Sequence, residues 1–507
     1  MGGVGTTPAS FCGLMEKLYV ACEFGTSISR IMLGTLHNNR LTMGELRRFA
    51  TPVAKVKKGL HWNIPELFQE MVKGLTELGK QEVNVEGISC SSWGGDYLLF
   101  DSDGTLLSPV FHHDDARSAS GQKVVLEKLS VETLYEETGV PIRPGSTIFQ
   151  LAMETPKRLK QSATLLPFAD GFNHLLGGRA CAEASLASNT QLYSPVTKSW
   201  SRRLTDELRL RSGLLPDIVP AGTRLGVLRP DLAKQTRIDT AQIIASCSSE
   251  LAASLSGLPL NHGRDWAYLR IGSESLIGTE VPDPIISEVT RALGYANETC
   301  LGGATNFYRR IVGLRILEEC RRYWIERDRE LCDDVLLHLA STSPAFETLM
   351  DPTDARFAEP GDMPLKIQAY CRETGQEIPR KPGQIIRCVL ESLALQYRKA
   401  FQETEILTGS KFSRLYLFGS GENSLLNHFI VNALQVPAIL ASPDAAAIGN
   451  VLVQALALQQ IKSLEAAHAI LSSSYKIQAI IPHPASWQAA AERLHELAAV
   501  GTQTSVA

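Results

Sequence analysis

Short runs of apolar residues, separated by Gly and Ser, mark the beginning of the chain and return in its second half. Residues 18–33 read as two strands joined by a turn, and residues 268–278 repeat the order of strand, Gly-Ser turn and strand. Runs of this kind are typical of β-hairpins. Two such hairpins, roughly half a chain apart, predict two related domains that close on one ligand. An ordinary β-turn is the alternative interpretation of either hairpin alone.

Elsewhere the apolar positions repeat with the spacing of an amphipathic helix or form continuous runs typical of buried strands. The pattern predicts helices over residues 62–81, 120–137, 148–160, 306–327, 383–403 and 445–460, and one that begins near Ser424. It predicts strands over residues 83–92, 97–100, 241–246, 414–418 and 436–440, with a helix of small residues after the third of them. Strands therefore alternate with helices along most of the chain.

The character of the sequence starts afresh near Pro259, which we interpret as a domain boundary. A chain of 507 residues is long enough for about two to four domains. We predict a flexible tail over residues 1–16, an N-terminal domain over 17–257, a C-terminal domain over 258–485, and a last helix and tail over 486–507.

Composition narrows the class of protein. Hydrophobic residues make up 44% of the chain and charged residues 21%, as in soluble globular proteins. A net charge of −4 argues against nucleic acid or an anionic membrane as a partner. The ten cysteines form no CxxC pair, so neither a zinc site nor a disulfide framework is indicated, and we expect reduced thiols in the cytoplasm. No apolar run is long enough to span a bilayer.

Two turns carry residues suited to phosphate binding. In the first hairpin, Glu23 precedes Gly25 and two hydroxyl residues. The backbone N–H groups of such a turn can approach a phosphate, and the carboxylate can hold a cation. In the second half, a strand, a Gly-rich turn over residues 419–423 and a helix N-terminus predict an anion or nucleotide site. A helix cap that contains Gly is the alternative for this second turn.

Many stretches in one order resemble those of the FGGY carbohydrate kinases, and among them most closely the rhamnulokinases. The resemblance covers the chain from about residue 18 to 484. The matching stretches are residues 20–33, 93–97 with Asp101 and Gly104, 115–117, Asp170 with Phe172, 185–192, 272–273, 306–317, 354–357, 366–397, Gly419 with 423–427, and 447–450.

This resemblance implies an α/β fold of two actin-like (ribonuclease H-like, ASKHA) domains, with ATP and a sugar in the cleft between them. It implies ATP-dependent phosphorylation of a ketose such as L-rhamnulose at O1, with ATP and Mg²⁺, by a cytoplasmic monomer or homodimer in rhamnose metabolism. The residues carried over to nucleotide binding are Gly25, Thr26, Ser27, Arg30, Gly272, Ser273, Gly419 and Asn423. Those carried over to the sugar are Trp93, Gly94, Gly95, Asp96, Asp115, Arg117 and Asp170, and Glu23 is carried over to the metal.

The sequence departs from this family at the position of the general base. Where the family has His-Asp-Thr at the end of a buried strand, this chain has Cys247, Ser248 and Ser249. A Ser at position 248 cannot take up the proton of a sugar hydroxyl without its own activating base. General-base catalysis is worth ~10²–10⁴-fold in rate. Glu250 is the possible substitute base, or else an acid favoured at a helix start by the helix dipole.

Other departures fall in and near the two hairpins. Glu23 replaces the family's Asp, Ser29 replaces a Gly and is expected to crowd the phosphate, and Ser91 replaces another Asp. Glu274, next to the conserved hydroxyl of Ser273, is expected to repel a triphosphate.

The run His112, His113, Asp114 and Asp115 has the composition of a metal site. Neighbouring residues on a strand point to opposite faces, which argues against convergence of these side chains. We therefore interpret the two histidines as loop residues, and Asp115 with Arg117 as a cleft-facing ion pair inherited from the family.

Two functions follow from these observations. The first is a rhamnulokinase-like kinase with weak or no activity, because Ser248 stands at the position of the base. The alternative is a catalytically inactive pseudokinase that binds a sugar or nucleotide as a sensor or regulatory protein. A Ser248→Asp variant separates them, since it should raise turnover sharply if only the base is missing.

Overall fold

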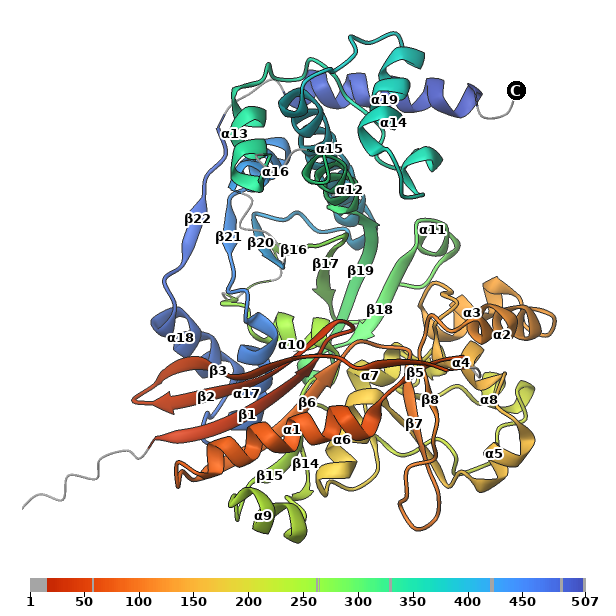
Figure 1. The fold of residues 1–507 in the computed structure, drawn as a ribbon, viewed down its shortest axis with the longest axis vertical. Coiled ribbons are helices and arrows are strands. Elements are labelled where there is room, and N and C mark those ends of the chain that lie inside the picture. The colour runs from red at the N-terminus through yellow and green to blue at the C-terminus, as the bar shows by residue number, and fades with distance from the viewer. Residues whose placement is uncertain are drawn as a thin grey trace, which may run out of the picture.

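The structure of the protein is a computed structural model, and it describes residues 16–56, 59–260, 263, 265–327, 331–419, 424–483 and 487–504. Figure 1 shows two lobes, the lower one formed mainly by the first half of the chain and the upper one by the second half. The helices α17 (Ala445–Ala457) and α18 (Leu464–Ser474) return to the lower lobe (Figure 1).

Each lobe is built around one sheet. The sheet of the first lobe has the strand order β14-β15-β6-β1-β2-β3, and that of the second lobe has the order β18-β19-β17-β16-β20-β21-β22. The strands of the first sheet are β1 (Lys17–Phe24), β2 (Ile28–His37), β3 (Arg40–Ala50), β6 (Val85–Ser92), β14 (Thr223–Val227) and β15 (Gln242–Ala245). The strands of the second sheet are β16 (Trp266–Ile271), β17 (Glu274–Val281), β18 (Tyr295–Thr299), β19 (Thr305–Val312), β20 (Arg414–Gly419), β21 (Ala438–Leu440) and β22 (Gln478–Ile480).

The two sheets repeat one pattern of pairing. In the first sheet β1 is antiparallel to β2 and parallel to β6, and in the second β16 is antiparallel to β17 and parallel to β20. The next strands outward follow the same rule, since β3 and β19 pair antiparallel while β15 and β21 pair parallel. The expected pair of related domains around two hairpins is confirmed, whereas their exact boundaries stay predictions.

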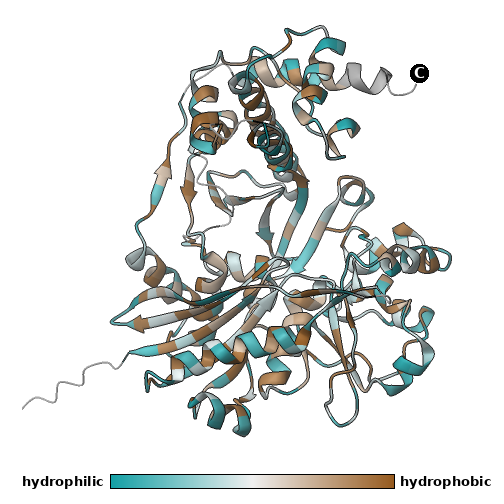
Figure 2. Cartoon of the chain, in the orientation of Figure 1, coloured by the Kyte–Doolittle hydropathy of each residue, from teal (hydrophilic) through white to brown (hydrophobic). Residues whose placement is uncertain are grey.

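The long predicted helices are present. They are α1 (Ile64–Gly79), α15 (Pro382–Thr408), α16 (Ser424–Leu434) and α17. The apolar residues Leu67, Met71 and Leu75 of α1 share a buried cluster with Val20 and Ile88 of the first sheet. Figure 2 shows hydrophobic and hydrophilic residues alternating around this helix. The helix therefore covers the sheet with one apolar stripe, as its sequence period predicts.

The predicted helix over residues 306–327 is wrong in its first part. Strand β19 occupies residues 305–312, and helix α12 (Arg315–Ile325) begins only after Gly313. The spacing of Phe307 and Ile311 fits a helix, but β19 pairs with β17 on one side and with β18 on the other. Pairing with the two preceding strands has prevailed over the local period.

Two further predicted helical stretches each divide into two helices. They are α2 (Ala116–Leu126) with α3 (Val131–Thr138), and α4 (Thr147–Leu151) with α5 (Pro156–Gln161). The hydroxyl groups of Ser130 and Thr155 accept hydrogen bonds from the first turns of α3 and α5. Such caps begin a new helix, and Pro156 suits the first helical position.

Some predictions lie outside the described residues, namely the tail over residues 1–15 and the turn over 420–423 with Asn423. Within the ranges that the structure describes, no helix combines the length and the apolar character needed to cross a membrane.

Candidate active site

A cavity of about 820 Å³ lies between the two lobes. This volume is in the range of pockets that bind small molecules. The predicted site residues that line it are Thr26, Trp93, Gly94, Gly95, Asp115 and Glu250. The second lobe contributes Arg270, Glu274, Glu298, Tyr308 and Arg310 to the lining. The cavity is therefore completed only when both lobes are in place.

Ser248 lies beside this cavity but faces into the first lobe. It follows β15 and is fully buried. Its hydroxyl donates to Asp170 Oδ1 at 2.7 Å, and its backbone N–H donates to Glu183 Oε2 at 2.9 Å. Asp170 belongs to α6 (Phe168–Leu176) and Glu183 to β10 (Ala182–Glu183). The position of the family base is thus occupied by a short side chain that is bonded to buried Asp170, while buried Glu183 holds the backbone of the same residue.

These two acids are perturbed by their surroundings. Burial raises the pKa of Glu183 to about 7, while hydrogen bonds from Ser185 and from the Ser248 backbone oppose the rise. Burial, helped by the charge of Glu183, also raises the pKa of Asp170, against the hydrogen bond from Ser248. Removing charged oxygens from water has this effect on any carboxyl group. A further acid at position 248 would join two groups that already resist ionisation.

Glu250 reaches the cavity, as expected for a substitute base, but it does not stand alone. It begins α10 (Glu250–Ser256), and its Oε1 accepts from Arg270 of the second lobe at 2.7 Å. One of the two oxygens of its carboxylate is therefore engaged in an ion pair that joins the two lobes.

Glu298 is a cavity residue that the sequence analysis missed. It belongs to β18, only 1% of it is exposed, and it accepts from the side-chain amides of Asn189 at 3.0 Å and Asn306 at 3.4 Å. Burial raises the pKa of Glu298. An acid inside a short strand was the available signal, but β18 was not predicted.

Glu23 forms a chain of charges with Arg30 and Asp444. Arg30 donates to Glu23 Oε2 at 2.6 Å and to Asp444 Oδ1 at 2.7 Å. Burial raises the pKa of Glu23 to about 7 although Arg30 opposes the rise, and the charge of Glu250 adds to it. The guanidinium thus lies where a cation would contact Glu23. These residues do not fit a Mg²⁺ ion bound directly by Glu23 unless Arg30 moves away.

Ser29 does not face the phosphate side of the first hairpin. Its hydroxyl is buried and lies 2.8 Å from that of Thr51, which in turn donates to the carbonyl of Gly25 at 2.5 Å. The expected crowding of a phosphate by Ser29 is therefore wrong, because Thr51 provides its side chain with a partner inside the lobe.

The turn of the second hairpin is surrounded by charged partners. The Ser273 hydroxyl donates to Glu318 at 2.8 Å. Glu274 lies 3.4 Å from Arg310 of the same lobe and 3.6 Å from Arg143 of the first lobe. The negative charge that was expected to repel a triphosphate is thus partly neutralised by arginines from both sides of the cavity.

The predicted nucleotide-binding residue Gly419 ends strand β20 with φ +104°, a conformation that favours glycine. A Cβ atom there would overlap the carbonyl oxygen of Ile271 in the neighbouring strand. Gly419 therefore allows β16 and β20 to end close together beside the second hairpin. Gly272 adjoins it, and its carbonyl accepts from the Leu314 N–H at 2.7 Å.

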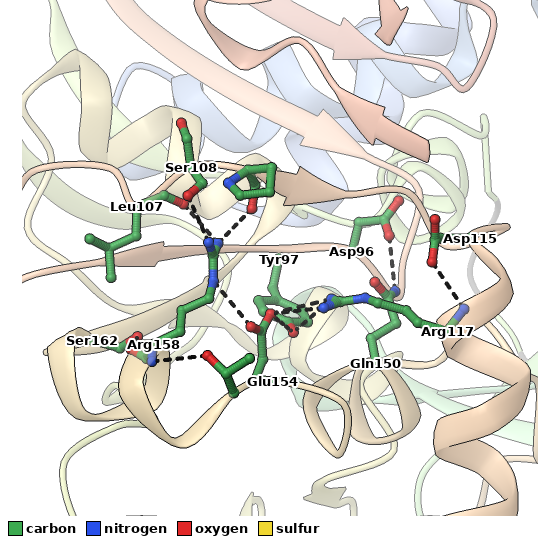
Figure 3. Close-up of polar contacts among 12 residues, drawn as sticks. Asp96, Tyr97, Leu107, Ser108, Asp115, Arg117, Gln150, Glu154, Arg158 and Ser162 are labelled. Atoms are coloured by element: carbon green, nitrogen blue, oxygen red, sulfur yellow. Dashed lines mark hydrogen bonds and ion pairs between the residues drawn. The ribbon is translucent and has the colours of Figure 1, made fainter. Parts of the chain in front are cut away.

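Asp96 is the most extensively hydrogen-bonded predicted sugar residue. Its Oδ2 accepts from the indole N–H groups of Trp62 at 2.8 Å and Trp93 at 2.7 Å, and it lies 2.7 Å from His113 Nδ1. Its Oδ1 accepts from Gln150 at 2.9 Å, a contact drawn in Figure 3. Asp96 itself is buried and does not line the cavity, whereas Trp93 and His113, which are bonded to it, do.

The expected ion pair between Asp115 and Arg117 is wrong. Asp115 caps α2, accepting from the backbone N–H groups of Arg117 at 2.9 Å and Leu60 at 2.6 Å. The Arg117 guanidinium instead pairs with Glu154 at 3.3 Å, and Figure 3 shows Glu154 between Arg117 and Arg158. Asp115 and Arg117 are two residues apart at the start of a helix, and side chains at this spacing do not face one another, which explains the difference.

Comparison with known proteins places these features in a family. The N-terminal domain of the FGGY family of carbohydrate kinases matches residues 18–257, and its C-terminal domain matches residues 267–458. The rhamnulokinase of Enterococcus faecalis is 32% identical over 473 residues, which cover 92% of this chain and 95% of that protein. The rhamnulokinase of Bacteroides thetaiotaomicron is 29% identical over 483 residues, which cover 94% and 98%.

Solved structures of sugar and polyol kinases share the fold. The gluconate kinase of Lactobacillus acidophilus superposes with a TM-score of 0.78 at 16% identity, covering 97% of this chain and 98% of that one. Plasmodium falciparum glycerol kinase with ADP superposes with a TM-score of 0.77 at 11% identity, covering 96% and 98%. The expected α/β fold of two actin-like domains is confirmed.

Proposed function

This chain belongs to the FGGY family of carbohydrate kinases, and we propose that it is a rhamnulokinase-like member with a strongly reduced rate of phosphoryl transfer. Its substrates are ATP and a ketose such as L-rhamnulose, and its product is the sugar 1-phosphate. The proposal rests on the likeness to rhamnulokinases over more than nine-tenths of the chain. The departure at Ser248 supports the reduced rate.

The single observation that carries the reduced rate of this kinase is the environment of Ser248. In the reaction, the sugar hydroxyl attacks the γ-phosphorus of ATP, the bond to the bridging oxygen of ADP breaks, and the hydroxyl proton needs an acceptor. The Ser248 hydroxyl is buried and donates a hydrogen bond to Asp170, so it does not provide the proton acceptor that the reaction needs. Glu250 faces the cavity, but Arg270 is bonded to it. The barrier therefore rises by the contribution of a general base.

The remaining machinery suits positioning rather than proton transfer. Trp93 and His113 line the cavity on the side of the predicted sugar residues and are held by Asp96. Arg270 and Arg310 line the opposite wall, where the phosphates of a nucleotide would develop charge. Phosphoryl transfer depends mainly on positioning and charge stabilisation, so a slow reaction can persist without a base.

The proposal is tested by ADP release with ATP, Mg²⁺ and L-rhamnulose, with a control that lacks the sugar. We expect sugar-dependent turnover about 10²–10⁴-fold below the ~1–100 s⁻¹ typical of kinases. Turnover within the typical range would contradict the reduced rate. Failure of both ligands to shift the melting temperature would contradict the proposed substrates.

A second candidate, the pseudokinase, is favoured by the ion pairs in the cleft. Arginines engage Glu23, Glu250 and Glu274 at 2.6, 2.7 and 3.4 Å. Such pairs stabilise a resting cleft at the expense of contacts with metal and phosphate. Binding of sugar or nucleotide without any sugar-dependent ADP release would select this candidate over the slow kinase.

A further inference from the structure

His112, His113 and Asp114 converge at the edge of the cavity, although they are consecutive in sequence. Strand β8 (Val110–Phe111) ends before them and α2 begins after them, so they lie in a turn as predicted. The alternation of a strand, which argued against convergence, does not apply. One ring nitrogen of each histidine and one carboxylate oxygen of Asp114 all lie within 4.8 Å of one another.

We propose that these three side chains form a binding site for a transition-metal dication of the Zn²⁺ class at the sugar side of the cavity. The proposal does not depend on the kinase reaction. Imidazole nitrogens with one carboxylate are ligands that Zn²⁺ accepts, whereas Mg²⁺ and Ca²⁺ prefer oxygen ligands throughout.

Two of the three distances between the ligand atoms are close to those of a zinc site. Asp114 Oδ2 lies 3.8 Å from His113 Nε2 and 3.9 Å from His112 Nδ1. Ligand atoms at ~2.0–2.2 Å from a tetrahedral zinc are roughly 3.4 Å apart. The Asp114 side chain is 75% exposed and therefore free to close this difference. Three protein ligands leave a fourth position for water or a sugar hydroxyl, as in zinc sites that act on substrates.

A carboxylate that would orient His113 toward a metal is already in place. Its Nδ1 lies 2.7 Å from Asp96 Oδ2, and the Asp96 side chain is fully buried. A carboxylate on one ring nitrogen fixes the tautomer in which the other nitrogen, here Nε2, carries a free electron pair for a metal. Both His113 and Asp114 line the cavity.

His112 is held in a similar manner. Its ring stacks on Trp62, with 4.1 Å between centroids and 25° between planes, and lies 4.3 Å from the His113 ring. Its Nδ1 accepts from the Asp114 backbone N–H at 3.0 Å, so this nitrogen carries the electron pair that would be exchanged for the metal. Asp115 is not a ligand, because its two oxygens accept backbone N–H groups.

The nearby positive charge is compensated. Arg143 lines the same cavity and its charge acts on His113, but Glu274 lies 3.6 Å from its guanidinium. Asp114 adds a negative charge at the site itself. A dication is therefore not opposed by an unpaired cation among these neighbours.

The test is a titration of the full-length protein, freed of metal with a chelator, with Co²⁺ and then Zn²⁺. Co²⁺ absorption in the visible range reports ligation by the protein, and calorimetry with Zn²⁺ gives the stoichiometry and affinity. Because the chain has 11 histidines, background binding is separated with variants. His113→Gln and the exposed Asp114→Asn remove ligands, and His174→Gln, whose Nδ1 lies 2.8 Å from the Gly178 carbonyl, is the matched control.

We expect one equivalent of metal, an affinity at least about tenfold lower in both ligand variants, and no change in the control. Asp96→Asn should weaken binding by ~10–100-fold, as does removal of a carboxylate that orients a metal-binding histidine. Equal binding by Asp114→Asn, His113→Gln and the unaltered protein would overturn the proposal, and so would no binding above that of free buffer. Thermal melts of the metal-free variants exclude unfolding as the cause of a loss.

Discussion

The buried acids around Ser248 link the stability of the first lobe to pH. Burial raises the pKa of Glu183 from an ordinary 4.5 to about 7. Between these pH values the folded protein keeps a proton that the unfolded chain has released. The free energy of unfolding therefore falls as the pH rises through this window, because the native state binds more protons.

Replacing Glu183 by Gln removes this titration. From pH 4.5 to 7 the unfolding free energy of the unaltered protein should fall, relative to that of the variant, by up to about 3 kcal/mol, since one pKa unit is worth about 1.4 kcal/mol. Urea unfolding at pH 5, 6, 7 and 8 measures this difference. Glu136→Gln, an exposed change on α3, is the control. Parallel pH profiles for Glu183→Gln and the unaltered protein would contradict the prediction.

The sequence could not predict whether the Ser248 side chain faces the cavity or the interior of the first lobe. The resemblance identified the position, but the partners Asp170 and Glu183 are 78 and 65 residues away in the chain. A serine at the end of a strand can turn to the cavity or to the interior, and only the packing of distant elements decides. The same holds for Arg30, whose partner Asp444 is 414 residues away.

Among the secondary-structure elements, the crossing of α10 and α17 most directly supports the site. A Cβ atom on Gly449 of α17 would overlap the carbonyl oxygen of Ala253 in α10, and one on Gly257 would overlap that of Ala445. The two helices therefore approach through glycines. Ser248 and Ser249 directly precede α10, and Glu250 is its first residue. The crossing with α17 therefore sets the position of these three residues relative to the cavity.

Gly449→Ala should separate the two helices. Overpacking of this kind costs about 1–3 kcal/mol, because backbone atoms must shift. Chemical unfolding measures the loss, with Gly44→Ala as the matched control, since a Cβ atom at Gly44 meets no atom within 4 Å. A Gly449→Ala protein as stable as the control variant would contradict the close crossing.

Elements with a clear local period were predictable, and strands whose residues lack that period or imitate the period of a helix were not. The apolar stripe of α1 and the two hairpins follow from spacing and turn residues alone. The apolar spacing predicts a helix where β19 pairs with β17 and β18, and β18 was not predicted because its five residues, YANET, show no alternation of apolar and polar positions. The omission of β18 also hid Glu298 from the predicted site.

In the whole molecule, the cavity depends on contacts between the lobes. Arg143 of the first lobe lies 3.6 Å from Glu274 of the second, and Asn189 of the first donates to Glu298 of the second at 3.0 Å. Both carboxylates line the cavity. The charge of Glu274 thus holds the lobes together and faces the space in which an anionic nucleotide would bind.

Glu274→Gln should raise the affinity for ATP about fivefold. A like charge at ~4 Å in a water-like medium costs about 1 kcal/mol, and its removal also frees Arg143 and Arg310 for phosphate. Titration with a fluorescent ATP analogue measures the dissociation constant. Glu288→Gln, an exposed change on α11 (Glu288–Ala292), controls for net charge. Unchanged or weaker binding by Glu274→Gln would contradict this role.

The most direct measurement compares ADP release from ATP and L-rhamnulose by the unaltered protein, Ser248→Asp, and the double variant Ser248→Asp/Asp170→Asn. In Ser248→Asp the new carboxyl group joins Asp170 and Glu183, two buried acids whose pKa values are already raised. Asp170→Asn replaces one of these acids by an amide that can donate a hydrogen bond to the new carboxylate. We predict turnover at least about 10²-fold above that of the unaltered protein for the double variant, and a smaller gain for the single one. No gain in a folded double variant that still binds ATP and sugar would contradict the claim that the residue at position 248 limits the reaction.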